Sequence, residues 1–537
     1  MKKLLLLLLI LSLCLTGCDA VVSITNIDFF GESEDETEAP DNGTEPDSGT
    51  EPDVSGKPSG TPSVDPEDCE DHEDVNDDGY CDLCYEYVIV VVDLYAINDL
   101  HGKVNAGDSQ PGIAGLTTYL KGVSNANTVL FSSGDMWQGS SESNLTHGAL
   151  VTEWMNELGF VSMTLGNHEY DWGESYIESN AELAEFPLLA INVYDKDTNQ
   201  LVDYATPSVV VSRGGVEIGI IGAIGDCYSS ISGDVTGGFY FKVGSDLTTL
   251  VKAEADRLRA EGVDFIVFSI HDGYDESFTS DKYLSANAIS YYDTALSEGY
   301  VDIVFEAHTH QSYVFYDKGD VHHLQGGGEN KGISHAVVSI NSANGNSDVT
   351  KTEIVKSSVY QSYSADPLIG DLLDKYSDDI SSAYEVLGYN PKYRDDSEIE
   401  QLVAQLYYEY GVEKWGDQYD IVLGGGFIRT RNPYNLYAGE VTYSDIYSLL
   451  PFDNELVLCS IKGSDLKKKF INTTNSDYYI YGDYDASSIK DNQIYYIVTD
   501  TYTSTYAYNN LTEVARYGTA IYARDLVTAF IKEGRWF

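Results

Sequence analysis

The stretch Val88-Ile-Val-Val-Val-Asp-Leu-Tyr-Ala-Ile97-Asn-Asp-Leu-His101-Gly102 says most about how this chain folds. Its first part, as far as Ile97, is nearly all apolar and rich in β-branched residues, which predicts a β-strand. Asp99 and His101 follow that strand two residues apart, on a segment where the chain turns. Both side chains can therefore point into one cleft at the end of the strand.

Four other stretches place a polar side chain at or just past an apolar run. They are Gly134-Asp135, Gly166-Asn167-His168-Glu169, His271-Asp-Gly273 and His308-Thr-His310. Carboxylate, imidazole and amide groups are ligands that suit two hard or borderline cations, and several strand ends must supply them because one strand cannot surround an ion. We therefore predict a two-metal site that cleaves phosphate esters.

The distribution of histidines favours the same interpretation. Five of the chain's 10 histidines lie in these stretches. One histidine after a strand is more often a hydrogen-bonded structural residue than a ligand, but that alternative would have to hold at every strand end independently. The histidines outside such a context, which we expect to be structural, are His147, His322, His323 and His335.

Further apolar runs alternate with helix-like stretches. The runs are Thr128–Ser132, Phe160–Leu165, Pro187–Val193, Val216–Ile224, Asp264–Ile270 and Val301–Phe305, and the clearest helices are Ala149–Leu158 and Leu247–Glu261. This alternation indicates an α/β layered domain. Apolar residues at helical spacing then predict one amphipathic helix over Asp366–Tyr384, which would join this domain to a second, α+β region.

Length and charge limit the possible functions. A chain of 537 residues is too long for one hydrophobic core, so two or more domains are expected. The formal net charge of -56 argues against nucleic-acid polymers as partners, because their phosphate backbones attract Lys and Arg. A phosphate substrate must instead be drawn in locally, by metal ions or a few arginines.

The N-terminus has the pattern of a targeting segment. Lys2-Lys3 precedes the short apolar stretch Leu4–Leu13, and Leu15-Thr-Gly-Cys18 resembles a bacterial lipobox. That resemblance implies cleavage before Cys18, lipidation of its thiol and a place outside the cytoplasmic membrane; an ordinary cleaved secretion signal is the alternative. Residues 19–68, rich in Glu, Asp, Pro, Gly, Ser and Thr from about residue 31, are predicted to form a flexible acidic stalk.

A small Cys/His motif occupies residues 69–86. Cys69-x-x-His72 and Cys81-Asp-Leu-Cys84 have spacings that can hold a zinc ion. Asp74-Val-Asn76-Asp-Asp78-Gly79 resembles the first half of a calcium loop, although Tyr85 stands where a bidentate Glu is needed. A disulfide among the cysteines is the third alternative outside the cell. The sequence leaves all three open.

Several of these motifs together resemble a known family. They are Asn98-Asp-Leu-His-Gly102, Gly134-Asp-x-x-x-Gly-Ser140, Gly166-Asn-His-Glu-Tyr-Asp171 and Ala307-His-Thr-His310. They look like those of the calcineurin-like metallophosphoesterases, and more narrowly like the bacterial 5'-nucleotidase, UDP-sugar hydrolase and 2',3'-cyclic phosphodiesterase group. The resemblance implies a four-layer α/β/β/α sandwich over residues 87–364, a linker helix over 365–384 and a smaller α+β substrate-binding domain over 385–537.

The resemblance also implies roles for the polar residues. Two divalent metal ions, Zn, Mn, Co or Mg, are expected. The implied ligands are Asp99, His101 and His310 for one ion, Asn167, His271 and His308 for the other, and Asp135 as the bridge. The pair His168 and Asp171 is expected to stabilise the transition state and to help the leaving oxygen depart. Some relatives have Gln at the position of His310, and Ala307 replaces the usual Gly; neither change removes a ligand.

The second half of the chain resembles the family less closely. Gly424-Gly-Gly-Phe-Ile-Arg429 looks like the signature whose arginine holds an anionic group. Phe452, in Leu450-Pro-Phe-Asp-Asn454, and Tyr502 would clamp a nucleobase between them. The family usually has Asn at the position of Gly424, its Gly-Gly-Asp-Gly after the second aromatic is replaced here by Thr503-Ser-Thr-Tyr-Ala507, and Arg394 does not align cleanly with a further substrate arginine.

We therefore expect a lipid-anchored, extracytoplasmic hydrolase that converts nucleoside 5'-monophosphates to nucleoside and phosphate. A 2',3'-cyclic nucleotide phosphodiesterase or UDP-sugar hydrolase is the nearest alternative, because the metal site would be the same. A nucleotide-binding lipoprotein without catalysis is the alternative from another class. The preferred base, the metal and the oligomeric state stay open at this point.

Overall fold

A computed structural model describes most of the chain from residue 58 onward. The described residues are 58, 62–65, 69, 72–105, 112–231, 235–273, 299–317, 320–428, 430, 435–474, 477–508, 510–516 and 521–535. Contacts along the chain divide it into Met1–Pro52 and Asp53–Phe537, and all described residues belong to the second unit. The predicted signal segment with Cys18, most of the predicted stalk, and Arg429 lie outside the described residues. Among the described helices, none has the length and apolar character needed to cross a bilayer.

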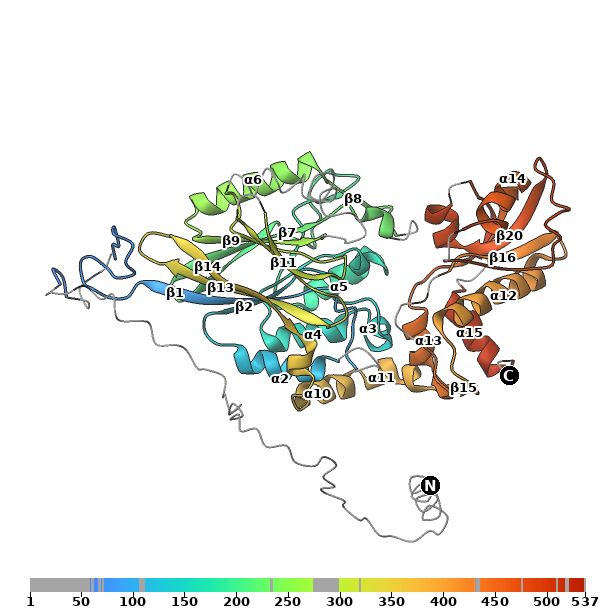
Figure 1. Cartoon of the computed structure of the whole chain (residues 1–537), viewed down its shortest axis with the longest axis horizontal. Coiled ribbons are helices and arrows are strands. Elements are labelled where there is room, and N and C mark those ends of the chain that lie inside the picture. Colours follow the sequence, from blue (N-terminus) through green and yellow to red (C-terminus); the bar gives the residue numbers. More distant parts are fainter. Residues whose placement is uncertain are drawn as a thin grey trace, which may run out of the picture. The chain divides into compact units, whose positions relative to one another are not determined.

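Two mixed sheets of six strands form the first domain. The first has the order β14-β13-β1-β2-β3-β4 and the second the order β11-β12-β10-β9-β7-β6. Their strands are β1 (Ile89–Ile97), β2 (Thr128–Ser132), β3 (Ser162–Thr164), β4 (Leu188–Leu189), β6 (Ser208–Arg213), β7 (Val216–Ile224), β9 (Phe265–His271), β10 (Ile303–Phe305), β11 (Ser312–Tyr316), β12 (His322–Gly326), β13 (Gly332–Asn341) and β14 (Ser347–Lys356). Figure 1 shows both sheets with helices outside them.

Three apolar layers hold the sandwich together. Leu94 and Phe131 of the first sheet pack with Val267 and Phe305 of the second, and all four side chains are buried. The outer face of the first sheet is covered by α2 (Ile113–Val123), α4 (Ala149–Leu158) and α5 (Glu174–Leu183), and that of the second by α6 (Ser245–Ala260). The predicted four-layer α/β/β/α order is therefore confirmed.

Parallel pairing decides where the strand ends lie. β1 and β2 run parallel, with Ile97 opposite Ser132, and β7 and β9 run parallel, with Ile224 opposite His271. The carboxyl ends of parallel strands meet at one edge of each sheet. The segments that follow β1, β2, β3, β9 and β10 are therefore brought to that edge.

The predicted run Pro187–Val193 is not one strand. It holds only β4 before the chain turns into β5 (Val193–Asp195), which pairs with β8 (Phe239–Phe241). The turn is fixed by Asn192, whose Nδ2 donates to the carbonyls of Ile224 and Lys242 while its Oδ1 accepts from the Ile224 amide. These side-chain hydrogen bonds take up backbone groups that would otherwise pair with a longer strand, so the strand ends here.

The single helix predicted over Asp366–Tyr384 is also wrong. The stretch contains α10 (Pro367–Lys375), α11 (Ser377–Ile380) and the short 3-10 turn η5 (Ser381–Tyr384). Tyr376 breaks the first helix, with φ -95° and ψ 13°, and its hydroxyl donates to Glu153 of α4 at 2.9 Å. The serines that follow compete for backbone hydrogen bonds and so favour new helix starts over continuation.

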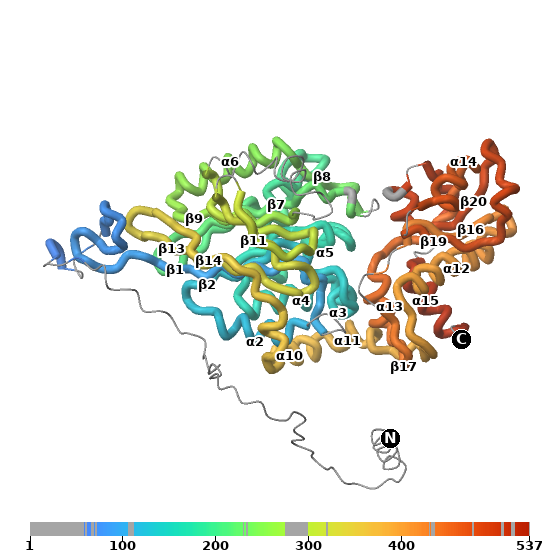
Figure 2. Tube along the Cα trace, in the orientation of Figure 1, coloured from blue at the N-terminus to red at the C-terminus, as the bar shows by residue number. Residues whose placement is uncertain are grey.

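The second domain is built on a mixed sheet of five strands in the order β19-β16-β20-β18-β21. Figure 2 shows α12 running beside β16 and β20. The elements are β15 (Val386–Asn390), α12 (Asp396–Trp415), β16 (Ile421–Phe427), β17 (Gly439–Thr442), α13 (Tyr443–Leu449), β18 (Leu456–Lys462), α14 (Gly463–Leu466), β19 (Tyr478–Tyr481), β20 (Ile494–Asp500), β21 (Thr512–Arg516) and α15 (Ala523–Lys532). A Cβ at Gly424 would lie 2.7 Å from Tyr408 Cα of α12, so the asparagine usual in the family has no room here.

A buried ion pair lies inside the second sheet. His323 Nδ1 is 3.0 Å from Glu306 Oε1, and its Nε2 is 3.9 Å from Asp317 Oδ2. Burial opposes protonation of the ring, but the two carboxylates outweigh it and raise the pKa of His323 to about 9. A raised pKa in the folded state stabilises the protein below the unfolded pKa of about 6.5, and this stability is lost as the pH rises through about 9.

We predict that His323→Gln flattens the stability profile of the chelated protein between pH 6.5 and 9. Relative to this variant, the parent chain should lose about 3 kcal/mol of unfolding free energy over that interval, measured by urea denaturation. His322→Gln is the control, because burial lowers the pKa of the half-buried His322 and removes it from this interval. Parallel profiles for the parent chain and His323→Gln would contradict the assignment.

Candidate metal centre and active site

The predicted ligands all lie at the carboxyl ends of parallel strands. Asp99 and His101 follow β1, Asp135 follows β2, Asn167 follows β3, His271 ends β9, and His308 and His310 follow β10. Strands from both sheets therefore contribute to one site. The positions agree with the pattern seen in the sequence, where each polar residue came at or just past an apolar run.

Asp99, His101 and His310 form a first cluster, in which the ligand atoms lie within 4.8 Å of one another. His101 Nε2 is 3.1 Å from His310 Nε2, and His310 Nε2 is 3.4 Å from Asp99 Oδ1. Two imidazole nitrogens and a carboxylate oxygen that face one point are a donor set for a divalent cation.

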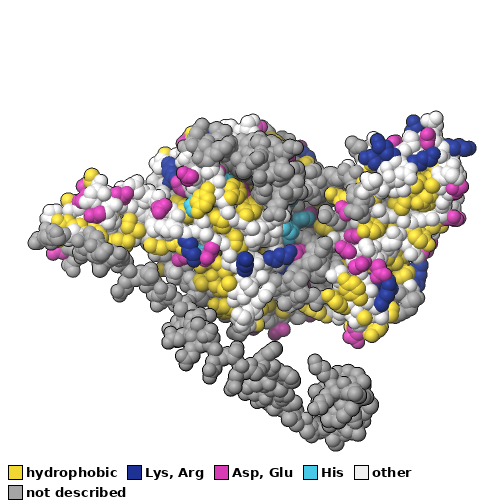
Figure 3. Space-filling view, viewed as in Figure 1, with side chains coloured by type: hydrophobic (Ala, Val, Ile, Leu, Met, Phe, Trp, Pro, Cys, Tyr) yellow, Lys and Arg dark blue, Asp and Glu magenta, His cyan; other side chains and the backbone are white. Residues whose placement is uncertain are grey.

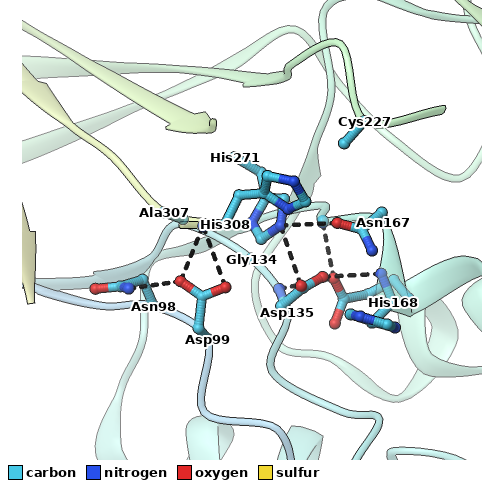
Figure 4. A network of polar contacts seen from close by, with 12 residues as sticks. Asn98, Asp99, Gly134, Asp135, Asn167, His168, Cys227, His271, Ala307 and His308 are labelled. Atoms are coloured by element: carbon cyan, nitrogen blue, oxygen red, sulfur yellow. Dashed lines mark hydrogen bonds and ion pairs between the residues drawn. The ribbon is translucent and has the colours of Figure 1, made fainter. Parts of the chain in front are cut away.

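Asp135, His271 and His308 form a second cluster under the same 4.8 Å limit. His271 Nε2 lies 3.1 Å from Asp135 Oδ2 and 3.2 Å from Asn167 Oδ1, so the amide oxygen belongs to this group too. Asp135 Oδ2 is also 3.9 Å from His101 Nε2, which places this carboxylate between the two clusters. Figure 4 shows Asp135 between His271, Asn167 and His168, with Asp99 near His308.

Backbone carbonyls select the tautomers of two histidines. His101 Nδ1 lies 2.8 Å from the carbonyl of Gln138, and His271 Nδ1 lies 2.9 Å from that of Ser133. A carbonyl can only accept, so each Nδ1 carries the proton. In the neutral ring, Nε2 is then left as the lone-pair donor, and it is Nε2 that faces the cluster.

Against the effect of burial, neighbouring histidines favour the ionised form of the two ligand carboxylates, Asp99 and Asp135, and lower the pKa of both. Although burial opposes ionisation, His271 and His168 hold the pKa of Asp135 well below its usual range. Burial also disfavours the charged ring of His271, yet Asp135 raises the pKa of His271 to about 10. Burial and the charge of His271 lower the pKa of His308 to about 4, which keeps that ring neutral. Without a metal, the charged ring of His271 balances the carboxylates beside it, and a divalent cation bound there would take over that role as the ring loses its proton. Among the described residues, the buried Asn167 Nδ2 has no hydrogen-bond partner.

Five of the ligands have left-handed backbone conformations. Their φ angles are 49° at Asp99, 50° at His101, 53° at Asp135, 67° at His308 and 56° at His310. Each such residue costs roughly 1–2 kcal/mol because its Cβ crowds the following carbonyl. This strain is therefore imposed by the surrounding fold and is concentrated at one site.

Two glycines let the loops approach closely. A Cβ at Gly166 would lie 2.8 Å from His271 Cε1 and closer still to Asp135 Oδ1. A Cβ at Gly134, where φ is +98°, would lie 2.7 Å from His271 Nδ1. Only glycine leaves room for the two ligands at these positions.

His168 and Asp171 form the expected pair. His168 Nδ1 lies 2.8 Å from Asp171 Oδ2, and the His168 amide donates to Asp135 Oδ1 at 2.8 Å. Asp171 therefore orients the His168 ring, which lines the cavity described below. The His168 ring centroid lies 5.2 Å from that of His101, so the pair borders the clusters.

Sequence reasoning missed Glu169 as a positioning residue. Its carboxylate is buried and accepts backbone amides from two loops, those of Asp135, Met136 and Gly166 at 2.7–2.9 Å. Burial and the charge of Asp135 raise the pKa of Glu169 to about 7. The residue stood inside a recognised motif, but nothing in the sequence indicated that its side chain points back to the backbone.

A cavity of 490 Å³ opens beside the pair. His168 and Asp171 line it, and so do Phe452 and Tyr502, the two aromatic residues predicted from the second domain. The ring of Phe452 lies 6.1 Å from that of His168. The cavity thus has an aromatic part and a part next to the ligand clusters.

Arg524 is a second residue that the sequence did not reveal. It is 5% exposed, lies between the rings of Tyr447 and Tyr522 at 4.3 and 4.5 Å, and forms an ion pair with Asp453. Its Nη1 also donates to the carbonyl of Phe452 at 3.2 Å. The guanidinium therefore fixes the segment that carries Phe452 into the cavity wall.

Comparison with known proteins adds an independent observation. The calcineurin-like phosphoesterase model matches residues 93–312, and the 5'-nucleotidase C-terminal domain model matches residues 380–522. Protein UshA of Yersinia enterocolitica is 26% identical over 425 residues, 69% of this chain and 74% of that protein. The 5'-nucleotidase of Homo sapiens is 30% identical over 194 residues, and this chain spans only 33% of its length. The crystal structure of a 5'-nucleotidase precursor from Thermus thermophilus has the same fold, with a TM-score of 0.62, 18% identity, and coverage of 83% of this chain and 96% of that one.

We predict that Gly166→Ala weakens binding of divalent cations about 10–100-fold, because the new methyl group displaces Asp135 and His271. Calorimetric titration of the chelated protein with Mn²⁺ measures the change. Gly122→Ala in α2 is the matched control, since a Cβ there meets nothing within 4 Å. It should leave cation affinity unchanged and stabilise the helix by up to about 1 kcal/mol. Equal affinity in Gly166→Ala and Gly122→Ala would refute the steric argument.

Proposed function

The chain belongs to the 5'-nucleotidase family of metallophosphoesterases, and on this basis we propose that it hydrolyses nucleoside 5'-monophosphates to nucleoside and inorganic phosphate. The observation that carries the proposal is the 490 Å³ cavity, which joins His168 and Asp171 to Phe452 and Tyr502. A nucleoside monophosphate has a charged end and an aromatic end, and the cavity offers a site for each.

We propose that the two clusters hold two divalent cations, Zn, Mn, Co or Mg. Asp99, His101 and His310 would hold one, Asn167, His271 and His308 the other, and Asp135 both. Bound there, the cations would supply a water of lowered pKa and neutralise charge on the phosphate. The Nδ1 protons of His101 and His271, fixed by backbone carbonyls, keep the Nε2 atoms available as ligands.

His168 is proposed to act on the leaving group. Asp171 holds its Nδ1 at 2.8 Å and the ring lines the cavity, so we propose that the imidazole donates a proton to the oxygen that departs from phosphorus. The amide of His168 holds Asp135 Oδ1, which couples the position of this ring to the cluster. Asp171 is proposed to position the ring and to balance its charge.

Phe452 and Tyr502 are proposed to hold the base. Each base has a π-face, so a pair of rings can bind nucleotides with little preference among them. Arg524 would act through Phe452 by fixing its backbone. We propose that Arg429 contacts the anionic group, as the family signature implies.

Two alternatives use the same metal site. A 2',3'-cyclic nucleotide phosphodiesterase or a UDP-sugar hydrolase would differ only in how the aromatic part of the cavity accepts the substrate. A nucleotide-binding lipoprotein without catalysis would have no use for the His168–Asp171 pair. A nucleic-acid polymer is disfavoured by the net charge of -56, and Figure 3 shows the described Lys and Arg side chains of one face in small separate groups.

We further propose an extracytoplasmic, lipid-anchored location, supported by the Leu15-Thr-Gly-Cys18 pattern alone. The intact mass of the mature N-terminus tests it, since an unmodified chain that keeps its first residues would exclude the anchor.

We predict that His168→Ala lowers kcat about 10²–10⁴-fold while its metal content stays at the parent level, because a positioned acid contributes that much. Phosphate release from nucleoside 5'-monophosphates, 2',3'-cyclic nucleotides and UDP-glucose is measured before and after chelation, and again after Zn, Mn, Co or Mg is added back. His322→Ala serves as the control. Turnover of cyclic nucleotides alone would favour the diesterase, and tight binding without turnover would favour the binding protein.

We predict that Phe452→Ala and Tyr502→Ala each lower kcat/KM for nucleoside 5'-monophosphates about 10-fold or more, since base stacking contributes roughly 1–3 kcal/mol. Ribose 5-phosphate has the same ester but no base, so its turnover should not change. Tyr389→Ala, an exposed tyrosine on β15, is the aromatic control. A parallel loss for both substrates would show that the rings do not hold the base.

A further inference from the structure

Four soft ligands converge in the segment before β1. Cys69 Sγ lies 3.9 Å from Cys81 Sγ and 3.7 Å from His72 Nδ1, and Cys84 Sγ lies 3.3 Å from His72 Nδ1. All four ligand atoms are within 4.8 Å of one another. No disulfide joins any of the described cysteines.

These distances match the edges of a zinc tetrahedron. With Zn–S near 2.3 Å and Zn–N near 2.0–2.1 Å, tetrahedral geometry puts sulfur atoms about 3.8 Å apart and sulfur about 3.6 Å from nitrogen. A disulfide needs its sulfurs about 2.05 Å apart, would leave one of three thiols over and would give His72 no role. The cluster as a whole thus has the size and the donors of a metal site.

We propose that Cys69, His72, Cys81 and Cys84 bind one structural zinc ion, separate from the two catalytic cations. Thiolate and imidazole are preferred by zinc, whereas calcium takes oxygen ligands. The four ligands complete a tetrahedron, which leaves no open position for a substrate. The ion is therefore assigned to stability and not to catalysis.

Acidic side chains between His72 and Cys84 already accept hydrogen bonds from backbone amides, which makes them less suited to hold calcium. Asp74 accepts from the amides of Asp78 and Gly79 at 3.1 and 2.9 Å, and Asp82 accepts from the Val75 amide at 2.8 Å. These carboxylates shape the turn between His72 and Cys81. Tyr85, at the position where a calcium loop needs a bidentate Glu, has φ 62° and turns the chain between Cys84 and β1.

The apolar core of the described part of this segment is small. Its apolar core consists of Cys81, Cys84 and Val88, with Leu83 and Ala343 packed beside them. So small a core cannot offset the ordering of the chain, and small domains of this kind are usually stabilised by a metal or disulfides. The Glu73 amide donates to Cys81 Sγ at 3.4 Å, a bond that supports a thiolate ligand.

The small Cys/His motif of residues 69–86, called the zinc segment from here on, is attached to the sandwich by side chains of the β13–β14 turn. Asn341 Nδ2 donates to Asp74 Oδ2 at 2.7 Å, and Asn344 Nδ2 donates to the Asp74 carbonyl at 3.0 Å. The zinc segment therefore lies at the start of β1, whereas Asp99 follows its end. Nine residues of strand separate the two sites by about 30 Å.

Cobalt substitution of the full chain tests the proposal. The described catalytic clusters contain no cysteine, so a thiolate-to-cobalt charge-transfer band that disappears in Cys81→Ser reports the proposed site. We expect this band in the parent chain, its loss in Cys81→Ser, and its retention in His72→Cys, which keeps four ligands. Cys459→Ser, a buried cysteine of β18, is the control and should keep the band. Hydrolysis of p-nitrophenyl phosphate should stay within about twofold in Cys81→Ser, because the sites are far apart.

A second measurement does not depend on variants that fold. Organomercurial titration of the zinc-loaded parent chain should release one equivalent of zinc, followed with a chromogenic chelator, as its thiols react. Absence of the charge-transfer band in the parent chain, or a band that persists unchanged in Cys81→Ser, would overturn the proposal. So would an intact mass showing a reducible disulfide in the purified protein, or no zinc release on thiol modification.

Discussion

Two buried carboxylates set the main electrostatic constraint on this structure. Asp99 and Asp135 are 0% and 1% exposed, and both follow parallel strands of the same sheet. Ionised groups at such depth cost several kcal/mol each unless opposite charge lies close by. The histidines of the second sheet, carried on β9 and after β10, face these carboxylates from the other side. The meeting of the two sheets at one edge therefore stabilises the buried charges of Asp99 and Asp135, in addition to packing the two sheets together.

The backbone shows the cost of this arrangement. Asp and His enter the left-handed region more often than most residues do, but each still carries a steric cost there, and five such ligands meet at this site. Their conformations are supported by the buried layers on either side and by Glu169, which joins the two loops through backbone amides. The site is an instance of strain stored where chemistry is expected.

Sequence patterns predicted the layered fold and the strand ends well, since both depend on apolar periodicity that can be read locally. The helix around Tyr376 and the strand around Ala190 were mispredicted because tertiary partners, Glu153 in one case and Ile224 in the other, outweigh local preference. Arg524 and Glu169 escaped notice for a related reason. Their roles depend on what the fold places opposite them, and no spacing in the sequence records that.

The second domain has Gly424 where the sequence resemblance leads us to expect Asn, and the fold explains the glycine. Helix α12 passes so close behind β16 that Gly424 has no room for a side chain. Phe452 is instead supported from its own domain, by a guanidinium held between two tyrosine rings. The packing of α12 therefore accounts for the glycine at position 424.

Strand β1 has a further consequence for how the molecule bears load. It is paired with β13 on one side and with β2 on the other, so its hydrogen bonds lie across its axis on both edges. A pull on Ile89 along that axis would strain many of these bonds at once in shear, instead of unzipping them one by one. The pairing of β1 on both edges therefore favours resistance to a load applied along the strand.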